Sequence, residues 1–335
     1  MENPKGKNED ALAVSREIRG HLISKYGILP ESVIAADWSI RTDRRGQKSY
    51  IETRRAGANW NTPFTLSDVH RGSSHSDFPH NLCRFLIQWL TVDKLKEPGY
   101  FHNYLPTVFD PFAGHNSRME DAFITHRNYV AHDICHEFME ANREIRDSLL
   151  SKGMFSDKPV IMLVEGDSRD INYTEEFDFS ITSPPFWDLE NYGPETGQLA
   201  NQITFNDFMW SLGQVFKNVH KALKPLSFFV VECNDFRRQG VFYTFHSSVI
   251  DWLKRVGFSI HDIIICDYRR SMLIAFASEM EQQKITGKRH SYFIVAHKGF
   301  EADNIDKVRE RLMEETKTTP KRPADREQLT MEGIR

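Results

Sequence analysis

One sequence feature constrains the fold of this chain more than any other. Short apolar runs that end in polar residues alternate with helical patterns. The first four runs end at strand-terminal polar residues: Asp110 in "TVFD", Asp133 in "NYVAHD", Asp167 in "PVIMLVEGD" and Ser183 in "FDFSITS". Three further runs follow, at 227–235, 259–268 and 290–298. This alternation predicts an α/β fold whose seven-stranded, mostly parallel sheet carries helices on both faces.

Three stretches between these runs have the spacing of amphipathic helices. The clearest covers 204–223, where apolar residues from Phe205 to Leu223 follow helical periodicity on one face. The stretches at 136–150 and 241–256 have a similar pattern. We interpret the apolar stripes as core-facing surfaces.

The polar run ends are candidates for a binding site. Parallel strands present their carboxyl ends at one sheet edge, and ligands bind there in open α/β sheets. Each Asp could instead cap the following helix, since Asp is a common N-cap residue. Four polar ends in succession favour the site.

Composition and charge limit the class of protein. The longest apolar runs are too short for a membrane span, and the first twenty residues have no apolar signal region. The four cysteines form no CxxC pair, so we expect a cytoplasmic, reduced protein without a zinc cluster. The net charge of -4 means that any nucleic-acid surface is a local patch.

Three zones divide the chain. Residues 1–75 are predicted to form an N-terminal extension, whose basic stretch at 41–55 is a candidate for phosphate contacts. Residues 76–300 contain the strand and helix patterns. Residues 301–335 are charged and lack aromatic residues, which predicts a short exposed helix and a partly disordered tail.

The loop after the first strand, "DPFAGHNS", combines a carboxylate with a tight turn. Gly114 allows a ligand to approach the backbone closely. Asp110 would repel a phosphate, so the loop favours an amine-bearing ligand over a dinucleotide. His132 and His136 lie four residues apart nearby, but one is on the strand and the other on the helix, so we expect no metal site.

Taken together, "DPFAG", the acidic end at Asp133, "EGD" and "TSPPF" resemble the amino-methylating DNA methyltransferases. Their motifs are DPF-x-G-x-G for the cofactor and [DNS]-PP-[YFW] for catalysis. The resemblance covers about 76–300, includes the preceding helix pattern at 76–87, and is closest to phage and prokaryotic DNA-modification enzymes. One departure is that His115-Asn116-Ser117 replaces the second glycine of the cofactor motif.

The resemblance implies S-adenosylmethionine as cofactor, double-stranded DNA as partner and a Rossmann-like methyltransferase sheet. It implies a cofactor site made of Asp110, Pro111, Phe112, Ala113, Gly114, Asp133, Ile134, Gly166, Asp167, Thr182 and Ser183. The implied catalytic residues are Ser183, Pro184, Pro185 and Phe186. Candidates for contacts with the substrate are Phe186, Trp187, Tyr192, Arg237 and Arg238.

The chemistry of amine methylation explains the Ser-Pro-Pro-Phe pattern. The exocyclic amine of a base is a poor nucleophile, so it needs acceptors that hold its N–H groups. Ser183 Oγ and the Pro184 carbonyl are suitable acceptors, because proline withdraws this segment from the strand ladder. Phe186 offers a face on which a flipped base can stack. By resemblance, serine at this position favours cytosine N4 over adenine N6.

Other functions remain as alternatives. An RNA or small-molecule methyltransferase could use the same fold, and so could a non-catalytic nucleic-acid-binding module. A nicotinamide dehydrogenase fits poorly, because the glycine fingerprint is missing. Target recognition is expected from the first hundred residues, the loop at 187–203 or the segment 269–289. The sequence leaves the oligomeric state and any role in restriction–modification open.

Overall fold

The computed structural model describes nine ranges and three single residues: 30–35, 38–42, 48–52, 78–91, 104–114, 117–189, 192–268, 277–287, 289–299, Leu22, Tyr26 and Ile28. The chain separates into two compact units, Met1–Gly299 and Phe300–Arg335. All described residues belong to the first unit. The expected tail at 301–335 and the basic run's residues 43–47 and 53–55 lie outside the described residues.

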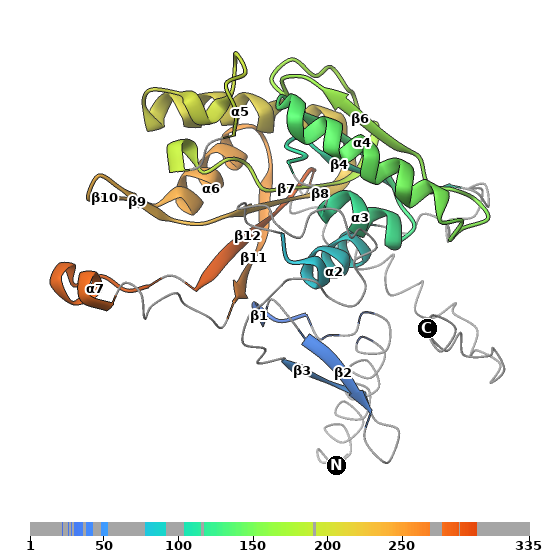
Figure 1. Ribbon diagram of the computed structural model, residues 1–335, viewed down its shortest axis with the longest axis horizontal. Coiled ribbons are helices and arrows are strands. Elements are labelled where there is room, and N and C mark those ends of the chain that lie inside the picture. Colours follow the sequence, from blue (N-terminus) through green and yellow to red (C-terminus); the bar gives the residue numbers. More distant parts are fainter. Residues whose placement is uncertain are drawn as a thin grey trace, which may run out of the picture. The chain divides into compact units, whose positions relative to one another are not determined.

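An eight-stranded sheet in the order β1-β11-β12-β8-β7-β4-β5-β6 forms the centre of the fold (Figure 1). Its strands are β1 (Val33–Ala35), β4 (Thr107–Asp110), β5 (Asn128–Asp133), β6 (Ile161–Glu165), β7 (Phe177–Thr182), β8 (Leu223–Cys233), β11 (Ser259–Asp267) and β12 (His290–His297). Only β12 runs antiparallel to its neighbours in this sheet. The predicted mostly parallel, Rossmann-like sheet is therefore confirmed.

The predicted number of seven strands is wrong, because β1 adds an eighth strand. Val33 pairs in parallel register with Ile265 of β11, and Ile34 is buried at the sheet edge. With three residues, β1 is too short to produce an alternating pattern. This strand also lies within the sequence range expected to form an N-terminal extension.

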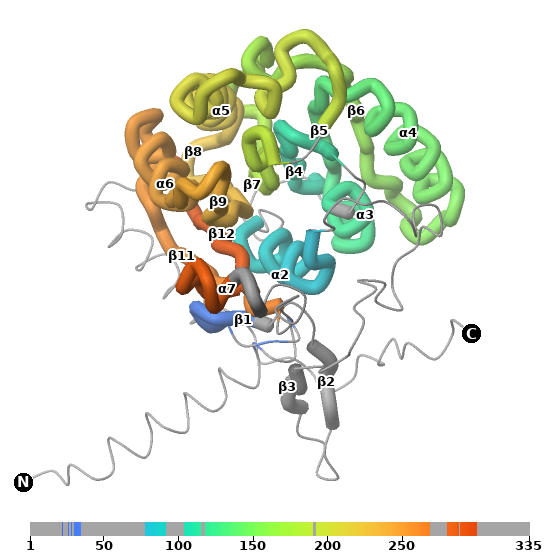
Figure 2. The backbone as a smooth tube through the Cα atoms, turned by 60° about the vertical axis from the view of Figure 1, so that its left-hand side comes forward, coloured from blue at the N-terminus to red at the C-terminus, as the bar shows by residue number. Residues whose placement is uncertain are grey.

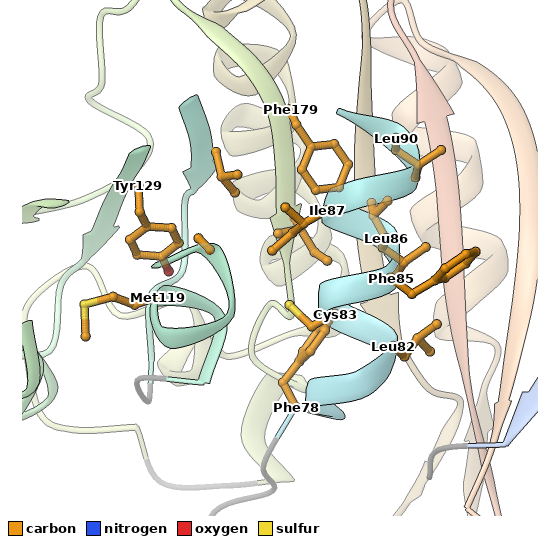
Figure 3. Packing of buried hydrophobic residues seen from close by; sticks show 14 of the residues in the cluster. Phe78, Leu82, Cys83, Phe85, Leu86, Ile87, Leu90, Met119, Tyr129 and Phe179 are labelled. Carbon is orange, nitrogen blue, oxygen red and sulfur yellow. The ribbon is translucent and has the colours of Figure 1, made fainter. Parts of the chain in front are cut away.

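Helices cover both faces of the sheet, as predicted (Figure 2). One face carries α2 (His80–Leu90), α3 (Ser117–Ile124) and α4 (His136–Ser151), and the other carries α5 (Phe205–Ala222) and α6 (Phe245–Arg255). Figure 3 shows α2 pointing Leu86 and Ile87 toward the sheet near Phe179. Each face thus has its own apolar core, and the sheet is packed between the two.

The helix predicted over 241–256 begins only at Phe245, because a hairpin occupies the preceding residues. Strands β9 (Phe236–Arg238) and β10 (Val241–Tyr243) pair antiparallel around Gln239 and Gly240. Both turn residues have positive φ, 51° and 79°, as a two-residue type I′ turn requires. The smaller elements are β2 (Trp38–Thr42), β3 (Lys48–Glu52), α7 (Ala277–Gln283) and the short 3-10 turns η2 (Trp187–Leu189) and η3 (Leu199–Asn201).

The strand order contains one reversal, between β4 and β7. From β4 the chain continues outward to β5 and β6 on one side, then returns to β7 and β8 on the other. Such a switch point opens a crevice outside the carboxyl ends of the strands. Within the part of the chain that the structure describes, no helix could span a membrane.

Candidate active site at the sheet switch point

A cleft enclosing about 500 Å³ of empty space, part of it open to solvent, lies at this switch point. Its walls come from the loops after β4, β5, β6 and β7. They include Pro111, Phe112, Gly114, Asp133, Ile134, Phe138, Gly166, Asp167, Ser168, Ser183, Pro185, Tyr192, Gly197, Gln198 and Leu199.

The loop after β4 is fixed to β5 through Gly114. Its N–H donates to Asp133 Oδ2 at 2.8 Å, and its carbonyl accepts from Asn142 Nδ2 at 2.8 Å. Gly114 has a φ of 48°, in the left-handed region that favours glycine. Ala113 N–H also donates to the His132 carbonyl, so the turn is held from two sides.

Asp110 ends β4, but its carboxylate points into the protein and does not line the cleft. It is completely buried and forms an ion pair with Arg118, whose Nε lies 2.5 Å from Oδ2. Thr182 Oγ1 and Tyr129 Oη also donate to it. Burial opposes the charge of Arg118, yet Asp110 outweighs that cost and raises the pKa of the guanidinium.

Arg118 also fastens the loop that lacks the second glycine. Its Nη2 donates to the Phe112 carbonyl at 2.5 Å and to the Ala113 carbonyl at 3.1 Å. One side chain therefore holds the end of β4 and the two residues that precede Gly114.

Asp133 lies on the cleft wall with a carboxylate that is partly shielded from water. Its Oδ1 accepts from Cys135 N–H and its Oδ2 from Gly114 N–H. Burial raises its pKa to about 6, although these two hydrogen bonds act in the opposite direction. Each oxygen retains a lone pair, so the carboxylate can also accept hydroxyl groups of a ligand.

Asp167 also lines the cleft, but Arg169 engages both of its oxygens. The closest pair is Arg169 Nη2 to Asp167 Oδ2, at 2.5 Å. The same nitrogen donates to the Gly197 carbonyl at 2.8 Å. A Cβ atom at position 197 would lie 3.0 Å from Arg169 Nη2 and from Asp167 Oδ2. Glycine at this position therefore allows the backbone to approach the ion pair closely.

The Ser-Pro-Pro loop closes the other end of the cleft. Ser183 and Pro185 line it, and Ser183 Oγ donates to Glu232 Oε2 at 2.5 Å. Glu232 lies near the end of β8 and is 7% exposed. Burial, reinforced by the Glu232 carboxylate, raises the pKa of Cys266 and of Tyr268, as expected for a charge in a poorly solvated region.

The residues after Ser-Pro-Pro divide between core and surface. Trp187 is buried, and its indole N–H donates to the Gln202 carbonyl at 2.8 Å. Phe186 is half-buried with its ring against Phe245. Arg238 forms an ion pair with Asp188 at 2.8 Å, whereas Arg237 is exposed.

Most of the expected cofactor residues come together in this cleft. Those that line it are Pro111, Phe112, Gly114, Asp133, Ile134, Gly166, Asp167 and Ser183. Asp110, Ala113 and Thr182 lie behind the wall instead. Among the expected substrate residues Tyr192 lines the cleft, whereas Phe186, Trp187, Arg237 and Arg238 do not.

Sequence reasoning missed Arg118, Arg169 and Glu232. The signal for Glu232 was present, because "FFVVEC" places a carboxylate within an apolar strand near its end. The two arginines carry no such local signal, because they act on carboxylates of neighbouring elements. Among the described residues no group of three or more His, Cys, Asp or Glu is arranged to hold a metal ion.

Comparison with known proteins gives partial likenesses. No family model matches the chain. A curated relative, the type II methyltransferase M.SmaI of Serratia marcescens, is 35% identical over 65 residues, which is 18% of this chain and 22% of the relative. The match therefore spans about a fifth of that protein's length.

Several solved structures are also similar to this chain. A SAM-dependent methyltransferase from Methanosarcina mazei is 11% identical with a TM-score of 0.40, covering 60% of this chain and 97% of that one. A protein described as a DNA modification methylase from Thermus thermophilus is 18% identical with a TM-score of 0.31, covering 41% and 52%.

Proposed function

We propose that this chain is a DNA methyltransferase that uses S-adenosylmethionine and modifies the exocyclic amine of a flipped base. Cytosine N4 is the favoured target, and adenine N6 is the alternative. One observation carries the proposal: a single cleft runs from Gly114 and Asp133 to Ser183, whose hydroxyl donates to the buried carboxylate of Glu232. The 65-residue likeness to a type II methyltransferase supports DNA as the substrate.

The residues of the cleft fit S-adenosylmethionine. Asp133 offers carboxylate oxygens to the ribose hydroxyls, and Ile134 and Phe138 offer apolar surface to the adenine. The turn at Gly114 offers backbone to the amino-acid moiety. Because Arg169 already engages both carboxylate oxygens of Asp167, we assign Asp167 to shaping the cleft wall. When bound, the cofactor supplies a methyl group activated by its sulfonium sulfur.

Ser183 and Glu232 prepare the amine. The Ser183 proton points to Glu232, so the lone pairs of Oγ remain available to accept an N–H of the base. The Pro184 carbonyl accepts the second N–H. The amine nitrogen of the base transfers a proton to Ser183 Oγ, while the hydroxyl proton of Ser183 moves to Glu232 Oε2. Ser183 therefore keeps a hydroxyl group, and the carboxylate of Glu232 becomes protonated. Phe186 is only partly buried, so its ring can support the base beside this loop.

The decisive experiment is nucleoside mass spectrometry on unmethylated DNA incubated with S-adenosylmethionine and either the wild-type protein or Ser183→Ala. We expect N4-methylcytosine from the wild type and a loss of about 100-fold or more in the variant, since an acceptor at the reacting nitrogen is removed. Ser183→Thr, which keeps the hydroxyl, serves as the matched control.

Other products would change the proposal in defined ways. N6-methyladenine would keep the mechanism and reverse the choice of base. Methylation of RNA alone would support the RNA alternative. Cofactor binding without a methylated product from DNA or RNA would contradict the nucleic-acid proposal, and absence of cofactor binding would support a non-catalytic module.

Cofactor affinity should depend on pH through Asp133. The ionised carboxylate accepts ribose hydroxyls, and its pKa in the free protein is about 6. Above pH 6 the Asp133 carboxyl group is already ionised. Below pH 6 it must release a proton before it can bind the ribose, so the affinity for S-adenosylmethionine should fall by up to about tenfold for each unit that the pH is lowered. Calorimetric titration of S-adenosylmethionine between pH 5 and 8 measures this slope. In Asp133→Asn the affinity should be lower and the profile flatter; an unchanged slope would contradict the assignment.

A further inference from the structure

The β9–β10 hairpin exposes apolar side chains and contacts the segment that follows Ser-Pro-Pro-Phe. Val241 is 54% exposed and Phe242 is 43% exposed, both on β10. The hairpin follows directly after β8, the strand that carries Glu232, and projects at the left edge of Figure 1 next to α6. An exposed aromatic on an element that contacts the segment after Ser-Pro-Pro-Phe is a candidate contact with the substrate.

The inner face of the hairpin is anchored to the segment that follows Ser-Pro-Pro-Phe. Phe236 and Tyr243 stack with ring centroids 5.3 Å apart, and Tyr243 also contacts the Trp187 ring at 5.5 Å. At the turn, Arg238 forms its ion pair with Asp188. The hairpin is therefore held in a fixed position relative to the catalytic loop.

The outer face pairs a cation with an aromatic ring. Phe242 lies directly opposite Arg237 in the β-ladder, and the guanidinium carbon lies 4.9 Å from the ring centroid. Asp188 neutralises Arg238, so Arg237 gives the hairpin a net positive charge. An apolar wedge beside an arginine is suitable for DNA, because apolar side chains insert between base steps while arginine meets the phosphates.

We infer that the β9–β10 hairpin enters the DNA duplex and that Phe242 fills the space left by the flipped base. This inference rests on the proposed function and adds the element that holds the duplex open. Extruding a paired base costs unpairing and unstacking energy, and a side chain that occupies the gap recovers part of that cost.

The test uses the target site found by sequencing DNA that the wild-type protein has methylated. Methylation rates are compared on a paired duplex and on a duplex with an abasic site opposite the target base, which removes the pairing cost. Phe242→Ala should lower the paired-to-abasic rate ratio by about tenfold relative to wild type, because only the paired duplex needs the wedge. Phe242→Trp should preserve the ratio.

Met162→Ala is the matched control, because Met162 has a similar exposed fraction, 41%, on β6, an edge strand of the main sheet that is separate from the hairpin. We expect its ratio to equal that of the wild type. Fluorescence of 2-aminopurine at the target position reports base extrusion independently, and it should be weaker with Phe242→Ala.

Two results would overturn the inference while leaving the proposed function intact. In the first, Phe242→Ala lowers the rates on the paired and the abasic duplex equally. In the second, it changes neither rate, which would indicate that the hairpin binds a protein partner instead of DNA. A wild-type protein that methylates no duplex would instead contradict the proposed function itself, and the inference with it.

Discussion

Glu232→Gln is expected to reduce the rate of methyl transfer by about 100-fold, within the range typical of a lost proton acceptor. The carboxylate accepts the hydroxyl proton of Ser183 at 2.5 Å, so the lone pairs of Oγ face the cleft. Glutamine has the same shape, but its amide can neither take up that proton nor polarise the hydroxyl to the same degree. The chemical step should therefore slow while the cleft keeps its form.

The kinetic constants separate this role from a structural one. Glu232 acts through Ser183, so kcat should fall while KM for DNA and the affinity for S-adenosylmethionine stay close to the wild-type values. Glu232→Asp keeps the charge on a shorter side chain and should retain an intermediate kcat. The variants can be compared by single-turnover methylation of DNA at saturating cofactor.

The thermal stability of Glu232→Gln provides the necessary control. Glu232 is 7% exposed, and a buried negative charge is costly. Replacing it with a neutral side chain should leave the melting temperature equal or higher. The role of Glu232 would be contradicted if Glu232→Gln lost activity together with stability, or if Glu232→Gln were as active as Glu232→Asp.

The three strand-end aspartates show how far the sequence predicts such a site. Asp110, Asp133 and Asp167 occupy equivalent positions in the pattern, and the structure confirms that β4 ends at Asp110 and β5 at Asp133, while β6 ends at Glu165, two residues before Asp167. The pattern of apolar runs is a local property of the sequence, so the strands, and the sheet edge at which their carboxyl ends meet, are predictable. The environment of each carboxylate is not, because it depends on which side chain of another element reaches it.

Their surroundings differ accordingly. The carboxylate of Asp110 forms a buried ion pair with Arg118 and faces away from the cleft. The carboxylate of Asp133 accepts two backbone N–H groups and can still accept hydrogen bonds from a ligand. The β9–β10 hairpin was missed for a related reason. Its strands have three residues each, and the apolar positions of β10 continue into the helical pattern of α6. A short strand beside a helix is therefore interpreted as part of that helix.

Arg118→Met is expected to lower the free energy of unfolding by about 3–5 kcal/mol, because it leaves the carboxylate of Asp110 buried without its ionic partner. Asp110 has no exposed surface and Arg118 is nearly as buried, so water cannot replace the lost contact. Denaturant unfolding monitored by circular dichroism measures the change. Arg143→Met, which removes two surface ion pairs, to Glu140 of α4 and Glu165 of β6, should leave stability nearly unchanged.

The double variant Asp110→Asn/Arg118→Met tests whether the unpaired charge is the cause. Removing both charges should restore most of the lost stability, since the penalty belongs to the isolated carboxylate. Cofactor affinity should remain reduced in the double variant, because Arg118 also holds the Phe112 and Ala113 carbonyls of the loop that leads to Gly114. This outcome would show that Arg118 stabilises the loop before Gly114 independently of its ion pair with Asp110. A double variant as unstable as Arg118→Met would show instead that the hydrogen bonds to the loop, rather than the ion pair, stabilise the switch point.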